Sequence, residues 1–103
     1  MEKQFYIYIL ANKQYGALYT GITSDLLKKV YEHKHGMMEG FTKEHGVKKL
    51  VYYEVVKDVI SAIEREKRMK KWNRQWKIEL IQSLNPDWDD LYNALIGSPL
   101  SRG

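Results

Sequence analysis

Five polar side chains that could act together on an anionic substrate are spread over four separate stretches of this 103-residue sequence. They are two tyrosines in apolar runs, a lysine and a histidine four residues apart, and a glutamate: Tyr8, Tyr19, Lys29, His33 and Glu66. Two phenols, a cation and an imidazole that converge on one pocket suit an anionic ligand or a phosphodiester, and a carboxylate would complete the set. Whether they converge depends on the elements that carry them.

The N-terminal part of the chain predicts a pair of strands. The run 5–11 is aromatic and β-branched, which favours a strand buried on both faces, and the strand pattern resumes over 18–22 after turn residues. We predict a hairpin with Tyr8 in its first strand and Tyr19 in its second; the alternative is two unrelated strands. Near the end of the second strand, the missing side chain of Gly21 would let a ligand backbone approach closely.

A helix is predicted to follow the hairpin. Thr23 and Ser24 can cap its N-terminus, Asp25 suits the positive end of its dipole, and Gly36 ends it. Spacings of four residues predict that the apolar side chains face inward, namely Leu26, Leu27, Val30 and Tyr31.

The same helical spacing places Lys29 and His33 on one face, with Asp25 another turn back. Most polar faces of this kind are simply solvated, and a lone histidine is more often a bystander than a catalyst. We interpret His35 and His45 as bystanders.

The middle of the chain predicts a third strand over 50–56, preceded by a loop over 37–46 with room for one helical turn at 41–44. Asp58 can then cap a helix that starts near Val59 and continues to about residue 71.

A further helix is predicted over 74–84 and a short last one over 89–95. We predict a single domain over residues 1–96 and a loose tail over 97–103. The element order ββαβαα predicts an α+β fold, a small sandwich with a three-stranded, mainly antiparallel sheet flanked by helices.

Glu66 is the most informative single residue. Spacings of three, four and seven place it on the apolar stripe of the predicted helix, which comprises Val59, Ala62, Ile63 and Met69. A carboxylate on a core-facing stripe must be paired, hydrogen-bonded or bound to metal, because a bare buried charge costs several kcal/mol. The plainer alternative is a salt bridge to a neighbouring lysine or arginine.

The composition is that of a soluble globular domain with a mild preference for polyanions. Seventeen basic and thirteen acidic residues give a net charge of +4 and a pI near 9.2. The absence of cysteine excludes disulfides and thiolate metal sites, and no apolar run approaches the roughly 18 residues that a membrane span needs. Because Met1-Glu2-Lys3 leads directly into a strand without an apolar leader, we expect a cytoplasmic protein.

Basic residues gather between 65 and 77, with Trp72 and Trp76 interleaved. Such a segment suits nucleic-acid phosphates; the alternative is a solvated face whose tryptophans anchor the core. We predict that the tryptophans are mostly core and the basic side mostly functional. The candidate nucleic-acid contacts, with one from the first helix, are Lys28, Arg65, Lys67, Lys70, Lys71 and Arg74.

Tyr6-Ile7-Tyr8, followed eleven residues later by Tyr19-Thr20-Gly21, resembles the paired signature of the GIY-YIG nuclease superfamily, with Tyr6 in the place of its first glycine. The likeness continues through SDLLKKVYEH and AIERE and covers about residues 4–81. The chain is similar to the small stand-alone bacterial members and to the nuclease domain of the excinuclease that acts in DNA repair.

The resemblance implies a GIY-YIG-type fold and metal-dependent hydrolysis of a nucleic-acid phosphodiester, in DNA rather than RNA. Glu66 would hold one Mg²⁺ or Mn²⁺, with waters in the remaining positions. Tyr8 or Tyr19 would orient or deprotonate the attacking water, and His33 could assist that proton transfer.

Lys29 departs from the family, whose members generally have arginine there to clamp the phosphate. Loss of the two-pronged donor could cost about 1–3 kcal/mol, or about ten- to a hundredfold in rate. The alternative is therefore a catalytically weak or inactive nucleic-acid-binding domain of the same fold. A third hypothesis is an interaction domain that uses its aromatic surface for a protein partner.

Overall fold

The computed structural model describes residues 3–38 and 40–97, and within these ranges three strands form one sheet. The strands are β1 (Phe5–Ala11), β2 (Leu18–Thr23) and β3 (Lys49–Val56), in the order β2-β1-β3. Both pairings are antiparallel, so the predicted hairpin is confirmed and β1 is the central strand.

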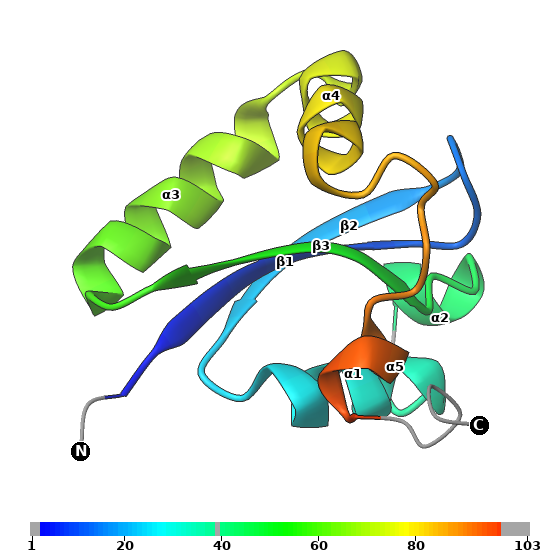
Figure 1. Ribbon diagram of the computed structural model, residues 1–103, viewed down its shortest axis with the longest axis horizontal. Helices are drawn as coiled ribbons and strands as arrows, with labels where there is room; N and C mark the ends of the chain where they lie inside the picture. Colours follow the sequence, from blue (N-terminus) through cyan, green and yellow to red (C-terminus); the bar gives the residue numbers. More distant parts are fainter. Residues whose placement is uncertain (1–2, 39, 98–103) are drawn as a thin grey trace.

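Helices cover both faces of the sheet (Figure 1). In the described part of the chain they are α1 (Leu26–Lys34), α2 (Phe41–Glu44), α3 (Val59–Lys71), α4 (Arg74–Leu84) and α5 (Tyr92–Leu95). On one side lie α3 and α4; on the other lie α1, α2 and α5. The predicted α+β class and the order ββαβαα are confirmed, with α2 and α5 as short additions. No helix among the described residues has the length and apolar character that crossing a membrane requires.

The side chains of β1 belong to two hydrophobic clusters, one on each face of the sheet, because alternate side chains of a strand point to opposite faces. Ile7 and Ile9 pack beneath α3 and α4, whereas Tyr8 and Leu10 pack against α1. All four side chains are buried, which confirms the prediction of a strand buried on both faces.

The N-terminus of α1 is capped by Asp25 itself, rather than by Thr23 or Ser24 as predicted. The Asp25 Oδ1 atom accepts a hydrogen bond from the backbone N–H of Lys28 at 3.2 Å. Thr23 instead accepts from the backbone N–H of Asp25 at 3.0 Å and so holds the capping residue.

The prediction that Leu27 and Tyr31 face inward is wrong, because both side chains are exposed. The buried residues of α1 are Leu26, Val30 and His33. A helix turns about 100° per residue, so Leu27 and Tyr31 are rotated away from that stripe. His33, which was treated as part of a polar face, is instead a member of the buried one.

On α3 the buried residues are Ala62, Glu66 and Met69. Glu66 therefore lies on the core-facing stripe as predicted. Val59 and Ile63 were predicted to share that stripe but are exposed, because the buried face of α3 is only one residue wide at each turn.

The burial of the tryptophans differs from the prediction that Trp72 and Trp76 are mostly core residues. Trp76 is 54% exposed and Trp72 is half-buried, whereas Trp88 is fully buried. Trp88 follows α4 in a segment held by the buried Asn85, whose Nδ2 donates to the carbonyl oxygen of Val51 at 3.0 Å.

The C-terminal helix begins at Tyr92 rather than at Asp89, because Asp89 is bound by the Asn85 side chain and the next two residues bond to β3. Asp90 accepts from the backbone N–H of Leu50, and Leu91 donates to the carbonyl oxygen of Leu50. Of the predicted tail, residues 98–103 lie outside the described part of the chain.

Candidate functional site

The rings of Tyr8, Tyr19 and His33 meet on the face of the sheet that α1 covers. Ring centroids are 6.3 Å apart for the two tyrosines, 6.1 Å for Tyr8 and His33, and 5.4 Å for Tyr19 and His33. The β1–β2 register explains the first pair: Tyr8 lies opposite Gly21 and Tyr19 opposite Leu10, so both phenols leave the same face of the sheet. The structure thus brings three of the five predicted residues into direct contact.

His33 is held through both ring nitrogens. Its Nε2 lies 3.4 Å from the Tyr8 hydroxyl, and its Nδ1 lies 3.1 Å from the hydroxyl of Thr42 on α2. A neutral imidazole has one N–H, so the ring donates through one nitrogen and accepts through the other. The side chain is only 4% exposed. Thr42 was missed by sequence reasoning, since no motif or helical spacing links it to His33.

The Tyr8 phenol packs directly against Gly21 of the neighbouring strand, β2. A Cβ atom on Gly21 would lie 2.5 Å from both Cζ and the hydroxyl oxygen of Tyr8. The open space that the sequence assigned to an approaching ligand is therefore occupied by Tyr8. Only glycine at position 21 leaves room for this ring.

The surroundings of Tyr8 oppose its ionisation. Burial raises the pKa of this phenol well above its usual range, and the neighbouring groups Tyr19, Glu66 and Glu32 raise it further. Glu66 acts on this phenol through its charge, although α3 lies on the opposite side of the sheet from α1.

The Glu66 side chain is nearly buried, with the residue 8% exposed. Its Oε2 lies 2.5 Å from Nζ of Lys70, one turn along α3, so the ion pair that the sequence offered as an alternative is present. The lysine side chain is 53% exposed and approaches from solvent. A divalent cation that displaced this lysine would keep the nearly buried carboxylate paired with a positive charge.

Lys29 lies beside the ring cluster on α1. Its Nζ is 3.6 Å from the Glu32 carboxylate, and it lines a polar hollow of about 340 Å³ with Lys28 and the residues 23–25. Burial lowers the pKa of His33, and the Lys29 ammonium lowers it further, with Glu32 opposing. The imidazole is therefore held in its neutral form near pH 7.

The possible metal ligands suit a divalent ion that keeps most of its waters, rather than an ion coordinated by protein side chains alone. Among the residues that the structure describes, no group of three or more His, Asp or Glu side chains could hold a metal. Glu66 supplies one nearly buried carboxylate. Mg²⁺ is commonly bound through one or two carboxylates, with waters and substrate phosphates completing its shell.

Residues 4–79 match the model of the GIY-YIG catalytic domain. The chain belongs to the GIY-YIG family.

Proteins with similar sequences are known from several bacteria. The chain is 38% identical to a UPF0213 protein of Staphylococcus saprophyticus over 81 residues, which are 79% of this chain and 96% of that protein. It is 40% identical to a UPF0213 protein of Clostridium perfringens over 78 residues, 76% of this chain and 83% of that one.

The fold is similar to the solution NMR structure of the UPF0213 protein of Bacillus halodurans. The TM-score is 0.54 at 24% sequence identity, over 87% of this chain and 95% of that one. This likeness supports the GIY-YIG fold described above.

The basic residues predicted to contact nucleic acid differ in their surroundings in this GIY-YIG domain. The Arg65 Nε donates to Glu54 on β3 at 2.8 Å, and its guanidinium lies over the Trp72 ring. The Nη2 of Arg74 donates to the carbonyl oxygens of Tyr15 and Gly16 at 2.5 and 2.6 Å. Lysines at three further predicted positions are exposed, namely Lys28, Lys67 and Lys71. Both guanidinium groups therefore have structural contacts, and the lysines are the better placed for phosphates.

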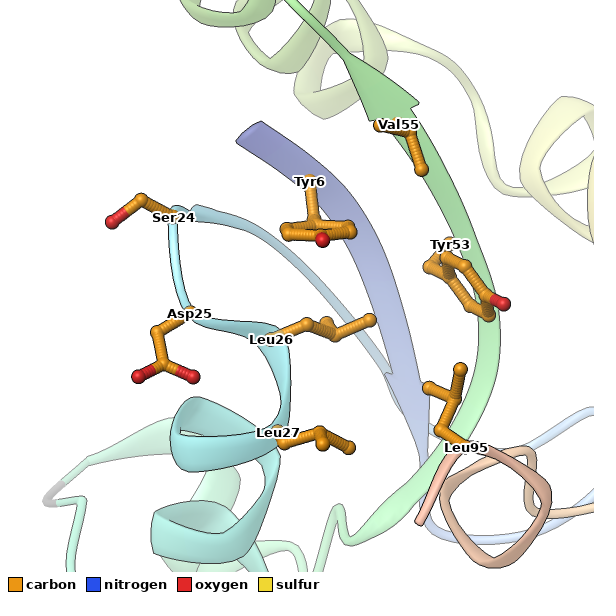
Figure 2. A pocket seen from close by; sticks show the side chains of 8 residues that line it. All are labelled: Tyr6, Ser24, Asp25, Leu26, Leu27, Tyr53, Val55 and Leu95. Atoms are coloured by element: carbon orange, nitrogen blue, oxygen red, sulfur yellow. The ribbon is translucent and has the colours of Figure 1, made fainter. Parts of the chain in front are cut away.

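A separate hollow of about 390 Å³ lies between the start of α1 and strands β1 and β3 (Figure 2). Side chains of Tyr6, Leu26 and Tyr53 line it, and Leu95 of α5 closes one end. Its lining is mainly apolar, and it includes none of the five residues predicted to act on substrate.

We expect His33 to make the stability of the domain depend on pH. Because its pKa is lowered in the folded state, its contribution is complete above the ordinary histidine pKa and is lost as the pH falls below it. Between about pH 7 and pH 5 the free energy of unfolding should fall more steeply for the wild type than for His33→Gln, by at most about 1.4 kcal/mol per pH unit. Urea denaturation at several pH values measures this; parallel curves for the two proteins would contradict it.

Proposed function

We propose that this GIY-YIG domain is an endonuclease that hydrolyses phosphodiester bonds in DNA with one divalent metal ion, Mg²⁺ or Mn²⁺, at Glu66. The observation that supports it best is the convergence of Tyr8, Tyr19 and His33 on one face of the sheet, with the nearly buried carboxylate of Glu66 near enough for its charge to raise the pKa of Tyr8. A solvated polar face would not bury an imidazole against two phenols.

Each residue has a role that follows from its surroundings. When bound at Glu66, the metal supplies Lewis-acid polarisation of the phosphate and charge stabilisation. Tyr8 orients the attacking water through its hydroxyl. As that oxygen takes up a proton from the water, the phenol passes its own proton to Nε2 of His33 over the 3.4 Å contact, so that the phenol stays neutral. The lowered pKa of His33 keeps that nitrogen free of a second proton, and Thr42 fixes the ring at Nδ1.

Tyr19 and Lys29 complete the proposed site. The Tyr19 ring packs on His33 and restricts its rotation, while its hydroxyl offers a second position for the water. Lys29 would bind the phosphate oxygens that gain charge in the transition state, exchanging its 3.6 Å contact with Glu32 for the substrate.

A nicking assay tests this function. Purified protein is incubated with duplex, single-stranded and branched DNA in the presence of Mg²⁺, Mn²⁺ or EDTA, and RNA of matching sequence is included. We expect metal-dependent strand cleavage of at least one DNA form. Cleavage that persists in EDTA, or that occurs on RNA alone, would contradict the proposal.

A second candidate function is nucleic-acid binding without efficient cleavage, which Lys29 favours. The ammonium at this position is a point charge that already contacts Glu32, and it lacks the planar fork of arginine. On this hypothesis the site binds DNA but stabilises the transition state weakly.

We expect Lys29→Arg to raise the nicking rate by about tenfold without changing DNA affinity, since a bidentate contact would form only as charge develops on the phosphate. Rates under single-turnover conditions and affinities in EDTA measure the two effects separately. Lys28→Arg, one position along α1, serves as the control. Equal rates for wild type and Lys29→Arg would show that lysine already suffices.

A further inference from the structure

The proposed mechanism makes no use of a cleft of about 340 Å³ beside the edge strand β2. It lies between α2 and the α3–α4 junction, across the start of β2. Its lining side chains are Ala17, Leu18, Phe41, Trp72, Arg74 and Lys77.

On each wall of the cleft, a lining residue is the sequence neighbour of a residue or helix that belongs to the site. Phe41 precedes Thr42, whose hydroxyl holds His33, and Leu18 precedes Tyr19. Trp72 directly follows α3, which carries Glu66 and its partner Lys70. The cleft is therefore built on the same elements that carry the site.

Aromatic rings are presented in this cleft rather than hidden in the core. Phe41 is 45% exposed and is supported by His45 at a centroid distance of 4.3 Å. Trp72 is braced by the Arg65 guanidinium, 5.2 Å from its ring centroid, and by the edge of Trp76 at 6.0 Å. Rings that are exposed yet braced make stacking platforms, because little side-chain entropy remains to be lost.

The polar lining of the cleft is cationic. Arg74 is fixed by the carbonyl oxygens of Tyr15 and Gly16, so its charge has a defined position. Burial lowers the pKa of Lys77, and the nearby Lys70 ammonium lowers it further. An anion bound there would relieve the repulsion between these lysines. An apolar protein segment would instead bury the charges without compensation.

We propose that this cleft binds an unpaired nucleobase beside the phosphate to be cleaved, with the base stacked on Phe41 and Trp72 and its phosphates near Lys77 and Arg74. The inference rests on the proposed function and names its substrate class. The preferred DNA has an unpaired nucleotide at the cleavage position, because a base inside an intact duplex cannot enter the cleft.

Phe41→Ala tests this inference through binding in EDTA, so that no cleavage is required. Three fluorescent DNA duplexes are compared by anisotropy: one with a single unpaired thymine, one with an abasic residue in its place, and one fully paired. We expect Phe41→Ala to weaken binding of the first duplex by about tenfold, and binding of the other two by less than about twofold. Phe41→Tyr, which keeps the ring, should bind like the wild type.

Tyr31→Ala is the matched control, because Tyr31 is 48% exposed and stacks on His35 in the way that Phe41 stacks on His45. It should leave binding of all three duplexes unchanged, and thermal unfolding should show that both variants are folded. Equal losses on all three duplexes with Phe41→Ala, or no loss on any, would overturn the inference. Base-dependent binding without any metal-dependent cleavage would support this inference while contradicting the proposed function.

Discussion

Replacing Glu66 with glutamine is expected to abolish metal-dependent nicking, with a loss on the order of 10³-fold, while DNA binding in EDTA is retained. Glutamine keeps the size of the nearly buried side chain but removes the charge that would attract a divalent ion. A metal ion supplies several kcal/mol of transition-state stabilisation, and each 1.36 kcal/mol corresponds to a tenfold change in rate. Single-turnover nicking and calorimetric Mn²⁺ binding should both be lost.

Glu64→Gln is the control for this experiment, because Glu64 is on the same helix with an exposed side chain. It removes the same charge from α3 without touching the site and should change the rate by less than about twofold. If Glu66→Gln still cleaved DNA at the wild-type rate with Mn²⁺, the metal would have to be held elsewhere, and the role given to Glu66 would be wrong.

The second large effect is expected from Gly21→Ala. The added Cβ would lie 2.5 Å from Cζ and the hydroxyl oxygen of Tyr8, so the phenol must move away from His33. Overpacking of this kind costs about 1–3 kcal/mol of unfolding free energy, and a displacement of about 1 Å in a catalytic group can cost about 10²-fold in rate. Denaturant unfolding and nicking measure the two losses on the same samples.

A double-mutant cycle isolates the cause of that loss. In a Tyr8→Leu background the ring that the new Cβ meets is gone, so Gly21→Ala should cost less than about 0.5 kcal/mol there. A full cost in both backgrounds would place the strain in the β2 backbone instead of in the contact with Tyr8. The cycle therefore tests the geometry of the site separately from its proposed chemistry.

The sequence by itself determined the elements and most of the residues of the candidate site. Strands followed from aromatic and β-branched runs, and α3 followed from Asp58, whose side chain does accept from the backbone N–H of Ser61. The position of Glu66 on a buried helix face followed from its spacing to Ala62 and Met69. These inferences succeeded because strand propensity, helix capping and helical periodicity are local properties.

Tertiary structure alone decided which groups those residues contact. Helical spacing shows which side chains share a face, but not how wide the packed face is, so Leu27 and Tyr31 turned out to be exposed. Likewise, the hydrogen bond between His33 and Thr42 and the ion pair between Arg65 and Glu54 join separate elements. Such contacts depend on the relative placement of elements, because a polar side chain pairs with whatever group the packing brings within about 3 Å.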